Sequence, residues 1–173
     1  MTPAAAATPA SWPALVAPLL DEPLVAVQWF QPGGRWSAPL RHVARRAAGR
    51  RRVEDGLPAM ALLIVTETRV SVRGVELSYA LPDRMRIMEP LGEWPRDQVT
   101  GTVRSVTVSH EATGLLATPH QRVELDLRRV ELATPDGPLV ADLPDRDRTT
   151  TAVCKALRLT PGVAPWRRLL GRG

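Results

Sequence analysis

The side chains with the clearest chemical potential in this 173-residue chain are clustered arginines. Residues 35–52 contain seven arginines and no acidic residue. At 100° per residue, Trp36, Leu40, Val43 and Ala47 fall on a helical stripe about 60° wide, with Arg41 and Arg45 opposite it. Guanidinium groups in such a set suit phosphates, acidic partners or an anionic surface. We take the following residues as the candidate anion- or partner-binding set: Arg41, Arg45, Arg46, Arg50, Arg51, Arg52 and Trp36.

Three interpretations of this segment stay open. In the first, the apolar stripe packs on the rest of the protein and the arginines are only solvated. In the second, the helix lies on an anionic membrane, with a second weak anchor in the tail at Trp166, Arg167 and Arg168. In the third, the arginines contact nucleic-acid phosphates, although 4% aromatic residues and the lack of a recognised motif disfavour sequence-specific readout.

Few other residues have the types and spacing of a reactive site. His110, His120 and Glu111 offer two nitrogens and a carboxylate for a metal if they flank a hairpin, but exposed loop positions explain the two histidines better. Cys154 fits a small core residue better than a nucleophile. Glu124 and Asp126, roughly 6.6–7 Å apart on one strand face, are typical of a solvated surface. We therefore predict no enzyme activity and no catalytic, cofactor-binding or metal site.

Charge and composition indicate the kind of chain that carries these residues. The net charge of +5 comes from +7 in residues 35–52 and +3 in 160–173, against −2 in 1–34 and −3 in 53–159. A single cysteine excludes an internal disulfide and fits a reducing compartment. No apolar run approaches the roughly 20 residues of a spanning helix. We expect a cytoplasmic protein, peripheral at the inner membrane face if the arginines bind lipid.

The hydrophobic pattern predicts mainly strands. Residues 60–65 form an apolar run, and after a polar break at Thr66–Thr68 the chain alternates through Arg73, which indicates a β-hairpin. Thr134–Gly137 and Glu93–Asp97 have turn composition. A β-bulge at Arg128–Arg129 would bring Val130 and Leu132 to the face of Val123, Leu125 and Leu127. Further strands are expected at 24–30, 85–88, 99–109, 114–118, 121–132 and 139–143.

Two helices and four segments complete the expected organisation. Trp36–Ala48 is the Arg-rich helix, and Asp145–Leu159 is a final helix capped by Asp145 or Asp147, with Thr149, Val153, Ala156 and Leu157 inward. The segments are a disordered Ala/Pro-rich N-terminus with a short apolar turn, a β segment plus the Arg-rich helix, a β domain with its capping helix, and a basic tail: 1–22, 23–56, 57–159 and 160–173. The sequence leaves open whether 23–56 packs on the β domain, and which oligomer forms.

About six or seven antiparallel strands followed by one helix resemble a pleckstrin-homology-like (PH-like) split barrel. The hairpin ALLIVTETRV at 61–70 is similar to the start of bacterial PH-like domains, and WPRDQV at 94–99 to their entry into a later strand. The resemblance implies a non-catalytic binding or scaffolding module for a protein partner or an anionic membrane. A nucleic-acid-associated protein is the alternative function, and a β-sandwich with a packed helix is the rival fold.

Overall fold

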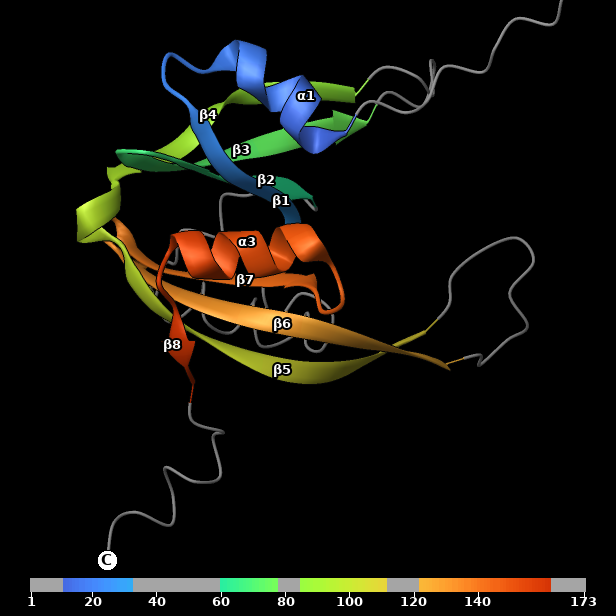
Figure 1. The fold of residues 1–173 in the computed structure, drawn as a ribbon. Coiled ribbons are helices and arrows are strands. Elements are labelled where there is room, and N and C mark those ends of the chain that lie inside the picture. The colour runs from blue at the N-terminus through green and yellow to red at the C-terminus, as the bar shows by residue number, and fades with distance from the viewer. Residues whose placement is uncertain (1–10, 33–59, 78–84, 112–121, 163–173) are drawn as a thin grey trace, which may run out of the picture.

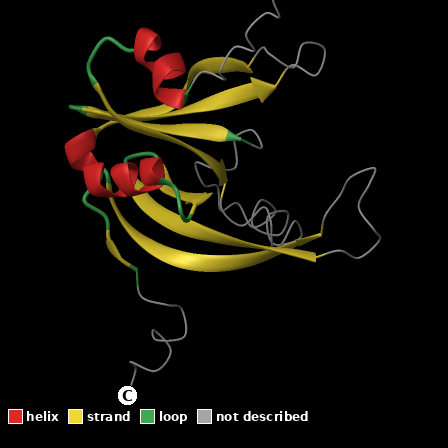
Figure 2. Cartoon of the chain, turned by 45° about the vertical axis from the view of Figure 1, so that its right-hand side comes forward, coloured by secondary structure: helices red, strands yellow, loops and turns green. Residues whose placement is uncertain are grey.

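The structure is a computed structural model that describes residues 11–32, 60–77, 85–111 and 122–162. The described chain is mainly β, with a helix near its C-terminal end, as the sequence predicted (Figures 1 and 2). The strands are β1 Leu24–Pro32, β2 Ala61–Thr66, β3 Arg69–Leu77, β4 Met85–Pro95, β5 Thr100–Glu111, β6 Arg122–Thr134, β7 Gly137–Pro144 and β8 Thr160–Pro161. The helical elements are α1 Trp12–Val16, η1 Ala17–Leu19, η3 Arg96–Gln98 and α3 Arg148–Ala156.

The strands form one open sheet in the order β4-β3-β2-β1-β7-β6-β5-β8. All pairs are antiparallel except β5 with β8, which is parallel and joins Thr102 to Thr160 and Val103 to Pro161. β1 is the central strand: residues 24–30 pair with β2, and Gln31 and Pro32 pair with β7. Residues 23–56, whose packing on the β domain the sequence left open, therefore begin with β1. This strand joins two meanders, β1–β4 and β5–β7.

The predicted hairpin is confirmed, with Val65 opposite Val70 and Leu63 opposite Val72. All six residues of β2 are buried. This explains why the segment is continuously apolar, because a strand covered on both faces has no solvent side. Leu63 and Val65 lie in the inner core of the molecule, and Leu62 and Ile64 lie in a second cluster on the other face.

α1 and η1 cover the second face of β1–β3 (Figure 1). Val16 is fully buried in this second cluster, where it lies with Val27 and Leu62, and Trp12 and Leu20 pack at its margin. The short apolar turn expected near the N-terminus is thus helical and packs on the sheet. It supplies the cover that the apolar outer side of a sheet requires.

α3 lies between the two halves of the sheet, against β1 (Figure 2). Asp147 is its N-cap and accepts a hydrogen bond from the Thr149 backbone N–H at 2.8 Å, so the second of the two predicted caps is the observed one. Thr150, Val153 and Ala156 are its buried residues. Thr150, rather than the predicted Thr149, is fully buried, and its hydroxyl accepts from Gln28 Nε2 at 2.9 Å.

Two predictions about the strands are wrong. β6 pairs with β5 and β7 without a register shift, so there is no bulge at Arg128–Arg129. Val130 and Leu132 belong to the inner core, and strict alternation then turns Leu127 to the opposite face. β4 is also much longer than the predicted 85–88, because it continues through Glu93–Pro95 as the outer partner of β3.

A side-chain hydrogen bond bridges the two halves of the open sheet. The Trp94 indole N–H at the end of β4 donates to Asp136 Oδ2 at 2.7 Å, and Asp136 lies in the turn between β6 and β7. That turn is the one predicted at Thr134–Gly137, and Gly137 has φ 120°. Trp94 itself is only 3% exposed and belongs to the inner core. The predicted strand at 114–118 and helix at 36–48 lie outside the described residues.

Candidate functional site

The residues chosen from sequence for anion or partner contact all lie outside the described residues. This holds for Arg41, Arg45, Arg46, Arg50, Arg51, Arg52 and Trp36, and for Trp166, Arg167 and Arg168 in the tail. His120 also lies outside. Within the described ranges no group of three or more His, Cys, Asp and Glu side chains is placed to hold a metal ion. In the same part of the chain, no helix is long and apolar enough to cross a membrane.

Cys154 packs against the inner core from α3 and is only partly exposed. Burial raises the pKa of its thiol, and the nearby Arg128 guanidinium offsets part of that rise. A thiol with a raised pKa carries little thiolate at neutral pH, and the thiolate is the reactive form. The surroundings of Cys154 therefore do not activate it.

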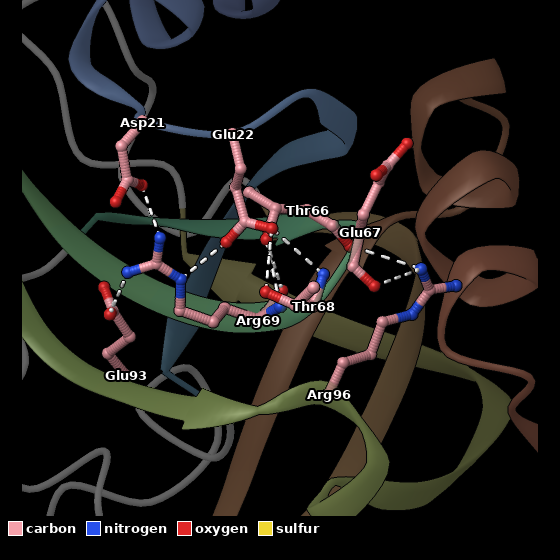
Figure 3. A network of polar contacts seen from close by, with 8 residues as sticks. All are labelled: Asp21, Glu22, Thr66, Glu67, Thr68, Arg69, Glu93 and Arg96. Atoms are coloured by element: carbon pink, nitrogen blue, oxygen red, sulfur yellow. Dashed lines mark hydrogen bonds and ion pairs between the residues drawn. The ribbon is translucent and has the colours of Figure 1, made fainter.

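The richest polar cluster surrounds the tip of the β2–β3 hairpin (Figure 3). Thr66 and Arg69 close the turn, since the Arg69 N–H donates to Thr66 Oγ1 at 3.0 Å and the Thr66 hydroxyl donates to the Arg69 carbonyl at 3.1 Å. We call the whole cluster the hairpin-end network; its members are Asp21, Glu22, Thr66, Glu67, Thr68, Arg69, Glu93 and Arg96.

Arg69 is held by three carboxylates from three parts of the chain. Its Nε donates to Glu22 Oε1 at 2.5 Å and its Nη1 to Glu93 Oε1 at 2.8 Å, and its Nη2 pairs with Asp21. These bonds raise the pKa of Arg69, with the Asp21 contact contributing most. The Arg69 cation is thus already neutralised by its neighbours and offers no free charge to an anionic ligand.

Glu22 is the most enclosed of the three carboxylates, with 14% of its side chain exposed. Burial alone would raise the pKa of Glu22, but hydrogen bonds from Arg69, Thr68 and Thr66 outweigh it and lower the pKa to about 2. The Thr68 hydroxyl and N–H donate to Glu22 Oε2 at 2.8 and 3.1 Å. The carboxylate therefore ties the segment before β1 to the hairpin tip.

Arg96 joins the same hairpin to the end of α3. Its Nη1 donates to the Thr66 carbonyl at 3.2 Å, and its Nη2 donates to the Ala156 carbonyl. A cavity of about 920 Å³ lies beside it. The charged residues that line this cavity have both signs: Arg96 and Arg158 against Glu67 and Asp97. This balance gives no preference for an anionic ligand.

A second hollow, of about 880 Å³, lies where β1, β6 and β7 meet the start of α3. Its apolar lining comprises Trp29, Leu125, Leu127 and Pro144. Asp142 at its base has a side chain with no exposure and accepts from Arg129 Nε and Nη2 at 2.7 and 2.8 Å. The sequence did not single out this surface, because Asp142 alternates with Leu139, Ala141 and Leu143 as a solvated residue would.

Comparison of the chain with protein families, curated proteins and solved structures finds no match. The functional proposal therefore rests on the sequence and on the geometry of the described residues. This geometry gives a mainly β protein in which the cation of Arg69 is paired within a net negative hairpin-end network, and in which the second hollow has an apolar lining beside the Asp142–Arg129 ion pair.

Proposed function

We propose that this chain is a non-catalytic, PH-like binding or scaffolding module for a protein partner or an anionic membrane surface. The proposed contact groups are the Arg-rich set at Arg41, Arg45, Arg46, Arg50, Arg51 and Arg52, with Trp36 beside it. The proposed location is the cytoplasm, with attachment at the inner membrane face when the partner is lipid.

The strand order is the main observation that supports the proposed PH-like fold. Two antiparallel meanders are joined through the pairing of β1 with both β2 and β7. A single helix, α3, then packs against β1 between the two halves (Figure 1). The two meanders and the packed helix support the proposed PH-like split barrel, and the Trp94–Asp136 hydrogen bond joins the two halves of the open sheet.

The hairpin-end network supports contact through another surface. In the PH-like resemblance, lipid head groups are met by basic residues of the first hairpin loop. Here the only cation in that loop, Arg69, contacts Asp21, Glu22 and Glu93. An anion at this position would meet a net negative cluster, and like charges at such distances repel.

The charge distribution favours the segment between β1 and β2. Residues 35–52 carry +7, whereas residues 53–159 carry −3. Each arginine near an anionic membrane surface contributes about 1 kcal/mol of attraction, and stable attachment generally needs two weak anchors. The tail at Trp166–Arg168 is the second anchor in this proposal.

Flotation of the full chain with liposomes tests the lipid partner. Vesicles rich in phosphatidylserine should carry the protein upward, and vesicles of phosphatidylcholine alone should not. Added salt should weaken the binding, because surface charge is screened within about 8 Å at physiological ionic strength. Equal failure with both vesicle types would reject the membrane as the partner and leave a protein partner or a nucleic acid.

A nucleic-acid-associated protein is the second candidate function, favoured by the same block of seven arginines. Contact with several phosphates predicts a steep linear fall of log affinity against log salt, similar for unrelated sequences. A flat salt dependence of binding to duplex DNA and to single-stranded RNA would reject this function.

A further inference from the structure

The outer face of β1, β6 and β7 is an apolar surface on the side of the sheet opposite the inner core. Val130 and Leu132 of β6 lie in the inner core, so Leu125 and Leu127 face outward. Val108 is paired with Leu125 across the β5–β6 ladder and shares that face. We define the outer face by its apolar residues: Trp29, Val108, Leu125, Leu127 and Pro144.

Part of this face is shielded from solvent although no described helix lies over it. Val108 is 6% exposed and Leu127 is 9% exposed, yet neither belongs to the inner core or to the second cluster. On the other half of the sheet the equivalent side is covered by α1 and η1 (Figure 1). An apolar sheet face is stable only when another element covers it.

Residues 33–59 connect two strand ends that lie at one corner of this surface. β1 ends where Gln31 pairs with Asp142 and Pro32 with Ala141, and Gln31 lines the hollow of the outer face. β2 begins with Ala61 paired to Phe30. The segment therefore leaves and returns at the same corner of the sheet, which gives it a high effective concentration at the outer face.

The apolar pattern of the segment also fits this face. In the helix that the sequence predicts, the stripe of Trp36, Leu40, Val43 and Ala47 matches an apolar floor, and Arg41 and Arg45 lie on the opposite side. Two of the aspartates that line the hollow, Asp142 and Asp145, are paired with Arg129 and Arg128. The match is therefore between apolar surfaces.

We infer that the outer face of β1, β6 and β7 is the docking surface for residues 36–47 of this same chain. Trp36, Leu40, Val43 and Ala47 contact the apolar floor, and Arg41 and Arg45 point away from the sheet. This goes beyond the proposed function, because docking within the chain stands even if no anionic partner binds. It also assigns any partner contact to the arginines rather than to insertion of Trp36.

Paramagnetic broadening in the full-length protein tests the docking. A nitroxide is attached after Ala44→Cys at the margin of the stripe, in a Cys154→Ser background. The amide signals of Leu125, Leu127 and Asp142 should broaden strongly at low protein concentration, and those of Met88 and Leu91 on β4 should not. The same label after Glu89→Cys should give the opposite pattern.

A surface variant keeps the inference falsifiable. Leu125→Glu should abolish the selective broadening while leaving the signals of α3 in place, and the matched change Val25→Glu, at a position 44% exposed, should leave the broadening intact. Broadening that grows with protein concentration would assign the face to a second copy of the chain and overturn the inference. Uniform or absent broadening of the outer-face signals would overturn it as well.

Discussion

Arg69 on β3 and Glu22 ahead of β1 form an ion pair with a Nε–Oε1 distance of 2.5 Å across 47 residues of sequence. The same arginine contacts Asp21 and Glu93 (Figure 3). One cation therefore joins the N-terminal segment, the first hairpin and the edge strand β4. This relationship makes the tip of the β2–β3 hairpin a structural joint of the fold.

The pair predicts a specific acid sensitivity. The pKa of Glu22 is about 2 in the folded protein against an ordinary value of 4.5. Because the folded-state pKa is depressed, its contribution to stability is fully present above about pH 4.5 and is lost as the pH falls toward 2. Urea unfolding midpoints measured between pH 7 and pH 2.5 should fall through this window, and Glu22→Gln should flatten the fall.

The control for this prediction is Glu67→Gln in the same hairpin turn, where the side chain is exposed. That variant should keep the wild-type pH profile. Parallel profiles for wild type and Glu22→Gln would contradict the role assigned to Glu22.

A second prediction concerns the ion pair at the base of the outer hollow. Arg129→Met removes both hydrogen bonds to Asp142, whose side chain has no exposure. An unpaired buried carboxylate costs about 3–5 kcal/mol, which chemical denaturation should detect. Arg104→Met on β5 is the matched control, since its partner Glu131 is 41% exposed at 3.2 Å and such pairs contribute about 0–1 kcal/mol. Equal losses of unfolding free energy in the two variants would contradict the difference between the buried and the exposed ion pair.

A third prediction tests the close approach of β5 to β6. A Cβ at Gly101 would lie 2.5 Å from the Glu131 carbonyl oxygen and 2.6 Å from Leu132 Cδ2. Gly101→Ala should therefore lower the free energy of unfolding by about 1–3 kcal/mol, as overpacking does. At Gly162 the nearest atom to a new Cβ is Thr102 Oγ1 at 3.3 Å, so Gly162→Ala should cost less. Thermal melts of both variants test this prediction. An unchanged melting temperature for Gly101→Ala would contradict the close approach of β5 to β6 at this position.

Local patterns in the sequence were sufficient for the elements with short-range signals. The hairpin around Thr66–Arg69 follows from an apolar run, a polar break and strict alternation, and the turn before Gly137 follows from its Pro-Asp-Gly composition. Asp147 was one of two expected caps, and Asp145 instead accepts a hydrogen bond from Arg128 Nε at 2.9 Å. Each of these depends on neighbours within a few residues.

The features that the sequence missed depend on distant partners. β1 joins the two halves of the sheet because its residues 24–30 pair with β2 and its residues 31–32 pair with β7. From the sequence we explained the change of parity in β6 by a bulge, which would have kept Leu127 on the core face. In the structure Leu127 lies on the outer face instead. No local pattern identifies Asp142 as buried, since an acid in an alternating strand usually faces water.

The central claim is that the arginines between β1 and β2, and not those of the sheet, meet the anionic partner. Flotation with phosphatidylserine vesicles should be compared for the wild type, for Arg50→Ser/Arg51→Ser/Arg52→Ser, and for Arg86→Ser/Arg146→Ser/Arg148→Ser, which removes the same charge from exposed positions of the described chain. We expect the first triple variant to lose vesicle binding on the order of 100-fold, at about 1 kcal/mol per arginine, and the second to bind nearly as the wild type does. Equal binding by all three proteins, or equal loss in both variants, would contradict the claim.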